Sequence, residues 1–166
     1  LPEALGVCDT LPDSWDQSSC YGGAFMENIT GVERDRRVLR HGDAHYPCSD
    51  VAERYRSSCY GMQTSWMFED GMSLEAVVAA CRAAGENSTS CFQSLGRDLS
   101  PRVRLQGPQP QADICARLVA DEQGPCIRGT AYALADHTWD GRYVYPFCAA
   151  FVDAALETEC FSVAQD

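Results

Sequence analysis

Large apolar residues recur along the chain at fixed positions relative to its ten cysteines. When the cysteines are taken in consecutive pairs, the residue after each second cysteine is large and apolar: Tyr21, Tyr60, Phe92, Ile127 and Phe161. An apolar residue also stands three positions after each first cysteine: Leu11, Val51, Ala84, Leu118 and Phe151. Because residues i and i+3 lie on one face of a helix, this pattern predicts helices that bury each cysteine among apolar neighbours.

The spacing of the cysteines is itself regular. Within the pairs the separations are 12, 11, 10, 11 and 12 residues, and the first members recur at steps of 40, 33, 34 and 33 residues. A period of about 20–50 residues is typical of repeat architectures, and turn-forming residues such as Pro12, Asp13 and Gly85 lie between paired cysteines. We therefore predict an all-α fold of five disulfide-stapled helical hairpins, stacked as an α-solenoid-like repeat array.

The repeat also predicts the domain organisation. We expect a single α-helical repeat domain over residues 1–166, with units at about 1–30, 47–70, 73–99, 108–137 and 143–166 and linkers at 31–46 and 100–110. The expected helix pairs are 2–11 with 14–28, 47–55 with 56–69, 73–84 with 87–99, 111–120 with 124–137, and 145–155 with 157–164. The second pair has the weakest turn signal, because residues 50–56 could continue as one helix.

One disulfide within each hairpin is the pairing that the repeat favours: Cys8–Cys20, Cys48–Cys59, Cys81–Cys91, Cys115–Cys126 and Cys148–Cys160. Two cysteines on either side of a tight turn have their Cα atoms about 5–6 Å apart, as a disulfide needs. The alternative is that disulfides join neighbouring repeats, for example Cys20 to Cys48. The chain has no C-x-x-C motif, which disfavours a structural zinc site and a thioredoxin-type redox site.

Composition and charge indicate the compartment and exclude two classes of partner. The 166 residues include 24 acidic and 13 basic residues, all of the latter Arg, for a net charge of −11. This charge predicts no nucleic-acid partner and no anionic membrane surface, and no apolar run approaches the roughly 20 residues of a transmembrane helix. Ten cysteines favour an extracellular or periplasmic protein. The start at Leu1-Pro2-Glu3, without Met, is what removal of a leader peptide would give.

The first linker contains the string Val38-Leu39-Arg40-His41-Gly42-Asp43-Ala44-His45. Arg-His-Gly followed by an acidic residue resembles the catalytic motif of the histidine phosphatase superfamily. The resemblance implies that His41 accepts the phosphoryl group and that Arg40 holds the phosphate. It covers about eight residues, and it departs from that family in lacking an apolar strand before the motif. The family also needs a second histidine after a later strand, whereas His137 lies in a predicted helical repeat.

A second interpretation of the same string is a metal site formed by His41, Asp43 and His45, because imidazole and carboxylate groups are common metal ligands. The alternative is an exposed polar loop in which His45 stacks near Tyr46. No cofactor is expected. Nucleophile and phosphate-loop motifs are absent from the sequence, and paired cysteines leave no thiol for catalysis. We therefore predict no catalytic residue.

Both asparagines of the chain, Asn28 and Asn87, begin N-x-[ST] triplets. The triplets predict N-glycosylation of exposed turns in a secreted protein. The alternative is that Asn28 ends a helix and Asn87 caps one. The aromatic residues Trp15, Trp66, Phe68 and Trp139 fall at hairpin spacing, and we expect them in the core or between repeats rather than in a ligand cage.

These patterns favour a secreted, non-enzymatic structural or binding protein. Neither end of the predicted array has the polar capping repeat of a soluble solenoid, so we expect a homo-oligomer formed through the array ends, such as a head-to-tail filament, or a protein ligand. The alternative is a metal-binding protein or phosphatase-like enzyme that uses residues 38–45. A third interpretation is that the chain is one domain of a longer protein, whose boundaries create the uncapped ends.

Overall fold

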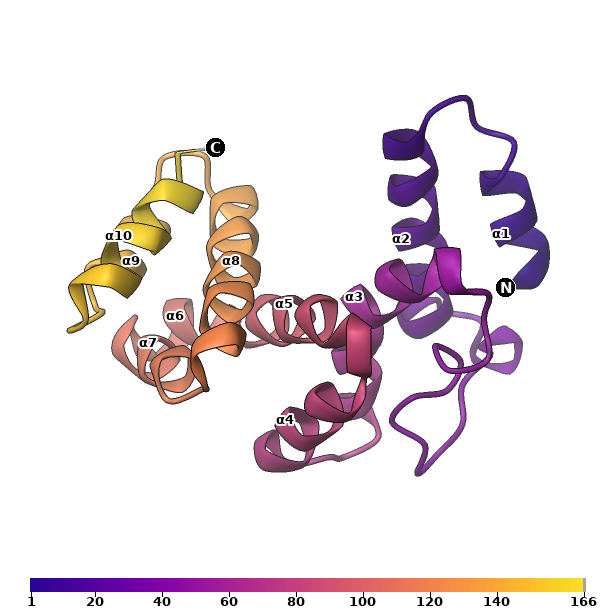
Figure 1. The fold of residues 1–166 in the computed structure, drawn as a ribbon, viewed down its shortest axis with the longest axis horizontal. Helices are drawn as coiled ribbons and strands as arrows, with labels where there is room; N and C mark the ends of the chain where they lie inside the picture. Colours follow the sequence, from indigo (N-terminus) through magenta and orange to yellow (C-terminus); the bar gives the residue numbers. More distant parts are fainter. Residues whose placement is uncertain (166) are drawn as a thin grey trace. The chain divides into compact units, whose positions relative to one another are not determined.

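The computed structural model describes residues 1–165, which are mainly α-helical and contain no strand (Figure 1). The chain divides into two compact units, Leu1–Cys91 and Phe92–Asp166. The single repeat domain expected over residues 1–166 stays a prediction. The stacking of all hairpins in one array stays a prediction.

The first unit contains the helices α1 (Pro2–Cys8), α2 (Ser14–Thr30), η1 (Arg34–Arg36), α3 (Glu53–Glu69), α4 (Leu74–Ala83) and η2 (Gly85–Asn87), and the start of α5 (Ser88–Leu99). Side-chain caps explain two helix starts, because Asp13 accepts a hydrogen bond from the Asp16 N–H and Ser73 accepts one from the Ala76 N–H. The long helices α2 and α3 make the most extensive packing of this unit. Its core includes the fully buried side chains of Phe25, Met67 and Val77.

The second unit contains the rest of α5 and the helices α6 (Pro101–Gln106), α7 (Gln109–Ala116), α8 (Ala120–His137), α9 (Val144–Cys148) and α10 (Ala154–Val163). Helix α8 packs against α7, α9 and α10 (Figure 1). Fully buried Leu95, Ile127, Leu134 and Phe147 form the centre of its core.

Buried polar groups also join the helices of the second unit. The Thr130 hydroxyl donates to the carbonyl oxygens of Gly96 and Cys126, both at 3.0 Å, and accepts from Gln111 Nε2 at 3.0 Å. Gln111 and Thr130 are both fully buried. Since a buried polar group without a partner is costly, these bonds specify how α5, α7 and α8 meet.

Five disulfides cross-link the helices: Cys8–Cys20, Cys48–Cys59, Cys81–Cys91, Cys115–Cys126 and Cys148–Cys160. The paired Cα atoms are 5.2–5.6 Å apart, within the ordinary range for a disulfide. No free cysteine is present among residues 1–165. Nearly all of the cysteines in these disulfides are buried, so the cross-links belong to the two cores.

The second predicted helix pair differs from the structure. Cys48 lies in a series of turns before α3, and no helix covers residues 47–52. Residues 45–51 form turns instead, in which the Ser49 N–H donates to the His45 carbonyl oxygen and the Val51 N–H donates to that of Pro47. Asp43 and Gln63 hold the residues just before: Asp43 accepts from the N–H groups of His45 and Tyr46, and Gln63 donates to the carbonyl oxygens of Ala44 and Tyr46. These bonds fix the backbone of residues 44–46 in a turn, and the second hairpin has only one helix.

The predicted linker at 100–110 also differs from the structure, because it contains helix α6 and the start of α7. Pro101 is the first residue of α6, where its missing N–H costs no intrahelical bond. Gly107 ends the helix with a φ of 87°, a conformation that favours glycine.

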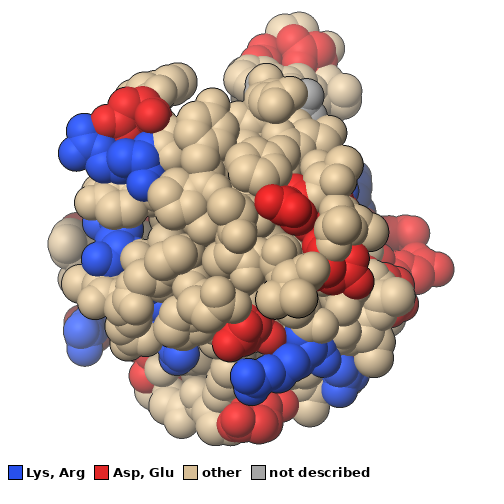
Figure 2. Space-filling model, turned by 90° about the vertical axis from the view of Figure 1, so that its left-hand side faces the viewer, with Lys and Arg blue, Asp and Glu red and all other residues tan. Residues whose placement is uncertain are grey.

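Acidic and basic side chains lie in small mixed groups on the face in Figure 2, around a wide area that has few charged side chains. Ion pairs between neighbours in sequence also occur in the chain, such as Arg36 with Glu33 and Arg117 with Asp113. No extended basic area is visible on this face.

Candidate functional site

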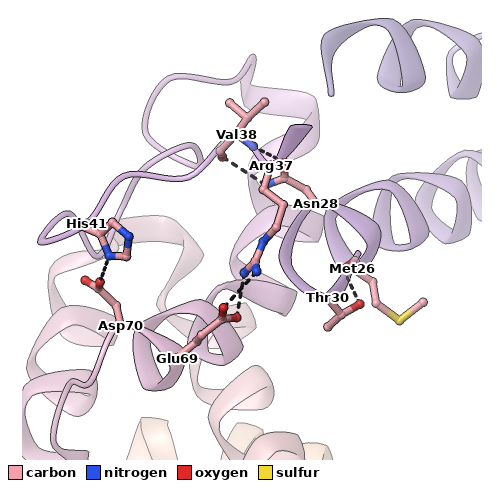
Figure 3. Close-up of polar contacts among 8 residues, drawn as sticks. All are labelled: Met26, Asn28, Thr30, Arg37, Val38, His41, Glu69 and Asp70. Carbon is pink, nitrogen blue, oxygen red and sulfur yellow. Dashed lines mark hydrogen bonds and ion pairs between the residues drawn. The ribbon is translucent and has the colours of Figure 1, made fainter. Parts of the chain in front are cut away.

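The segment of residues 31–52, here called the connecting segment, joins α2 to α3 and carries the predicted site residues. Asn28 of α2 holds its middle: the Asn28 Nδ2 donates to the Val38 carbonyl oxygen at 3.1 Å, and the Val38 N–H donates to the Asn28 Oδ1 at 2.7 Å (Figure 3). Asn28 is only 7% exposed. The side-chain amide thus pairs with this backbone as a neighbouring strand would.

Arg37 fastens the same segment to the end of α3. Its two Nη atoms donate to the two carboxylate oxygens of Glu69, at 2.9 and 2.7 Å (Figure 3). The Arg37 side chain is 10% exposed, and its guanidinium lies 5.8 Å from the centre of the Trp66 ring. The hydrogen bonds from Arg37 lower the pKa of Glu69, so this two-bond ion pair is formed at neutral pH.

His41 lies beside Asp70, the residue that follows α3. The His41 Nδ1 is 2.5 Å from the Asp70 Oδ1, and the Gly42 N–H donates to the Asp70 Oδ2 at 2.8 Å (Figure 3). The bond from the Gly42 backbone, followed by the bond from His41, lowers the pKa of Asp70. The His41 side chain is 88% exposed, so this contact joins the connecting segment to the C-terminal end of α3 at the protein surface.

Asp43 and His45 have other partners. Asp43 Oδ1 accepts from the N–H groups of His45 and Tyr46, both at 3.1 Å, and Oδ2 accepts from Arg40 Nη1 at 3.2 Å. Burial opposes ionisation, but these backbone bonds keep the pKa of Asp43 below its ordinary value. The His45 Nδ1 lies 3.0 Å from the Tyr60 hydroxyl, and burial raises the pKa of Tyr60.

The structure does not gather the predicted metal ligands His41, Asp43 and His45 into one site. Each has different hydrogen-bond partners, and no group of three or more His, Cys, Asp or Glu residues within 1–165 is placed to hold a metal ion. The physical reason is that each of the three side chains has its own partner: His41 meets a carboxylate, Asp43 caps backbone N–H groups, and His45 meets a phenol.

The resemblance to the histidine phosphatase motif is not matched by the surrounding fold. The described chain has no strand before His41. Arg40, the implied phosphate ligand, has its guanidinium 4.0 Å from the centre of the Tyr46 ring and forms an ion pair with Asp43. His137 lies in helix α8, where its Nε2 accepts a hydrogen bond from Arg104 at 2.8 Å.

Sequence reasoning missed a cluster around Asp9. The hydroxyls of Tyr21 and Tyr55 donate to its two carboxylate oxygens at 2.7 and 2.6 Å, and Arg54 donates to it at 2.8 Å. The bond with Tyr21 is the main cause that lowers the pKa of Asp9, and the same bond raises the pKa of Tyr21 to about 12. The cluster joins the end of α1 to α2 and α3. No motif could have revealed it, because Asp9 and Tyr55 are 46 positions apart.

The two predicted glycosylation sites have different surroundings. Asn28 is buried and both atoms of its amide are hydrogen-bonded to Val38. Asn87 is half-buried at the end of the short helix η2, and its neighbours Glu86 and Thr89 are exposed. A glycan on Asn28 Nδ2 would displace Val38, whereas Asn87 lies on a surface turn.

Two of the four predicted core aromatics are at the surface instead. Trp66 is buried at 4% exposure and Phe68 is half-buried, but Trp15 and Trp139 are 75% and 94% exposed. The prediction was wrong for these two because neither lies on a buried helix face: Trp15 is in the first turn of α2, and Trp139 is in the loop after α8. A tryptophan exposed to this degree gains nothing from core packing.

None of the helices within residues 1–165 combines the length and apolar character needed to cross a membrane. The five disulfides fit an oxidising compartment.

In comparisons with known proteins, no family model, no curated protein and no solved structure matches this chain.

Proposed function

We propose that the protein acts in an extracellular or periplasmic compartment as a non-enzymatic structural or binding protein. The disulfides and the two buried cores supply a stable scaffold. The disulfides also support the compartment, because they persist only where thiols are not kept reduced. The polar side chains of residues 38–45 also support a structural role. Their hydrogen bonds hold the connecting segment against α3 and its end, and hold the segment to itself.

The observation that carries the proposal is the exposure of large apolar side chains on the first and last hairpins. Val7 and Trp15, in the first hairpin, are 64% and 75% exposed, and Val152, in the last hairpin, is 98% exposed. A large exposed apolar side chain gains free energy when a partner covers it. We propose that the partner is a second copy of the chain, which joins the last hairpin of one molecule to the first hairpin of the next.

Sedimentation velocity over a micromolar concentration series, followed by negative-stain microscopy, tests this assembly. The expected result is a rising mean mass and elongated particles, because a head-to-tail contact that does not close forms an open filament. The variants Trp15→Glu and Val152→Glu should each return the protein to monomers, and Leu105→Glu, at a residue 80% exposed outside the two terminal hairpins, should not. A wild-type protein that stays monomeric at every concentration overturns the assembly.

A second candidate function is metal binding or a phosphatase-like reaction at residues 38–45. It is favoured by one contact: Asp70 engages the His41 Nδ1, and the other ring nitrogen has no hydrogen-bond partner among residues 1–165. A carboxylate on one nitrogen is the usual way to orient a histidine that binds a metal or moves a proton. Metal analysis of the purified protein, with phosphatase turnover before and after His41→Ala, tests this candidate: loss of both signals in the variant would support it, and no metal and no turnover in the wild type would reject it.

A further inference from the structure

The second unit has a surface cavity of about 450 Å³ formed by the end of α8, the loop after it, α9 and the end of α10. Three aromatic side chains line it: Tyr132, Trp139 and Tyr145, which are 41%, 94% and 48% exposed. Three large rings that stay in contact with solvent around one cavity differ from the scattered apolar residues of an ordinary surface. The cavity has the size of a small-molecule site, for which about 300–1,000 Å³ is typical.

The fold holds one of these rings in place. Gly141 has a φ of 72°, and a Cβ at this position would overlap the ring of Tyr145. The ring of Tyr145 is also stacked with that of Phe161 of α10, at a centroid distance of 6.3 Å. The glycine therefore lets the backbone lie against the ring, so that part of the cavity wall is formed before any ligand binds.

The charge of the cavity is negative. Asp136 is the one charged residue among those that line it, and its carboxylate has no hydrogen bond or ion pair within the described chain. The nearby cations are engaged: Arg142 Nε donates to Asp140 at 2.7 Å, and Arg104 donates to His137. Asp136 also lies in the last turn of α8, where the helix dipole disfavours a carboxylate. Asp136 is exposed, so its carboxylate is accessible to a ligand from solvent.

We propose that this cavity binds a free small molecule with a quaternary ammonium group. The faces of aromatic rings attract a cation, and Asp136 supplies the opposite charge. A guanidinium or a primary ammonium is bound best by several carboxylate or carbonyl oxygens, whereas Asp136 is the one carboxylate among the lining residues and the other polar side chains are the hydroxyls of Tyr132, Thr138 and Tyr145. A quaternary ammonium donates no hydrogen bond, so it gains most from ring faces and one carboxylate. The cavity includes Tyr145 of the last hairpin, but the residues that carry this proposal, Asp136 and Trp139, differ from Trp15 and Val152, which carry the proposed self-association.

Titration with choline, followed by tryptophan fluorescence and calorimetry, tests the proposal. The matched probe is the neutral isostere of choline, in which a tert-butyl group replaces the trimethylammonium group. The expected result is saturable binding of one choline per chain, with the neutral compound bound about tenfold or more weakly because it lacks the charge. Equal binding of the two compounds, or no saturable binding of choline, overturns the proposal.

Variants locate the binding in the cavity. Trp139→Leu and Asp136→Asn should each weaken choline binding about fivefold or more, and both residues are exposed, so the core is unaffected. Two controls match them in the same unit: Leu105→Ser removes an exposed apolar side chain, and Asp121→Asn removes an exposed carboxylate from the other end of α8. The controls should bind choline as the wild type does. Unchanged binding in both cavity variants, with a helical circular dichroism spectrum, overturns the site.

Discussion

Gly96 and Gly129 occupy reciprocal positions where helices α5 and α8 meet. A Cβ on Gly96 would overlap the carbonyl oxygen of Cys126, and a Cβ on Gly129 would overlap that of Gln93. The next residue, Thr130, donates its hydroxyl to the Gly96 carbonyl oxygen at 3.0 Å. The two glycines thus let the backbones touch, and the threonine turns the close approach into a hydrogen-bonded contact in the core of the second unit.

Gly129→Ala should therefore destabilise the protein. We expect the free energy of unfolding to fall by about 1–3 kcal/mol, because the added methyl group forces the two backbones apart. The matched control is Gly23→Ala in helix α2, where a Cβ would meet nothing within 4 Å. This control should gain about 0.5–1 kcal/mol from the higher helix propensity of alanine. Urea unfolding of both variants measures the difference, and equal stabilisation by the two would contradict the close contact.

Asn28→Asp should loosen the connecting segment. The aspartate can still accept from the Val38 N–H but has no donor for the Val38 carbonyl oxygen, which lies 3.1 Å from the Asn28 Nδ2 in the structure. Leaving a buried acceptor unpaired costs about 1–3 kcal/mol. The control is Asn87→Asp at the half-buried surface turn, which also removes a glycosylation triplet. Chemical denaturation should show a loss for Asn28→Asp only, and equal effects would mean that the amide does not hold Val38.

Glycosylation should distinguish the same two asparagines. In a eukaryotic secretory host we expect a glycan on Asn87 and none on Asn28, because Asn28 is 7% exposed and its amide is hydrogen-bonded on both sides. Treatment with a peptide N-glycosidase converts a glycosylated asparagine to aspartate, so peptide mass spectrometry reports each site. An aspartate at position 28 after this treatment would contradict the burial of that side chain in the structure.

The Asp9–Tyr21 pair predicts a dependence of stability on pH. The pKa of Asp9 is lowered in the folded protein, so its contribution is present above the ordinary pKa and is lost as the pH falls through the folded value. The pKa of Tyr21 is raised to about 12, so its contribution is present below the ordinary pKa of the phenol, about 10, and is lost as the pH rises towards 12. The pair therefore stabilises the fold in the range between these two limits.

Urea unfolding of the wild type and of Asp9→Asn at a series of pH values measures the acid side. The difference in the free energy of unfolding between the two proteins should shrink as the pH falls below about 4, because the wild-type carboxyl then becomes protonated. On the alkaline side, the phenols of Tyr21 and Tyr60 both have a raised pKa, so ultraviolet titration of the wild type should show late-ionising phenols, and Tyr21→Phe should remove one of them. A difference that does not change with pH would exclude a charged Asp9 as the acceptor.

Much of the helical fold could be predicted from the cysteine spacing and the apolar positions beside it. The expected helices 14–28 and 73–84 lie close to α2 and α4, because caps such as Asp13 and Ser73 are local signals. The second hairpin was not predictable in this way. Asp43 and Gln63 hold the backbone of residues 44–46, just before this hairpin. Gln63 lies 17 to 19 positions from the carbonyl groups of Ala44 and Tyr46 that it binds, so no local signal in the sequence indicates these bonds.

The surroundings of the site residues were less predictable than the helices. The string from Val38 to His45 contains residue types suited to metal or phosphate chemistry, but Asp70 and Tyr60, which lie far along the chain, engage its histidines. The cavity around Trp139 was missed for a related reason. Helical spacing suggests which residues can share a face, whereas Trp139 lies in a loop, where exposure depends on the packing of neighbouring helices.

Peptide mapping of the native protein under non-reducing conditions tests the central claim most directly, because the fold, the compartment and the lack of a reactive thiol all depend on the disulfides. Proteolysis at acidic pH, which prevents exchange, should release five linked peptide pairs, each joining the two cysteines of one hairpin as in the structure. No peptide should react with a thiol reagent. A peptide that links Cys20 to Cys48, or a full set of free thiols in the protein from its native source, would contradict the account.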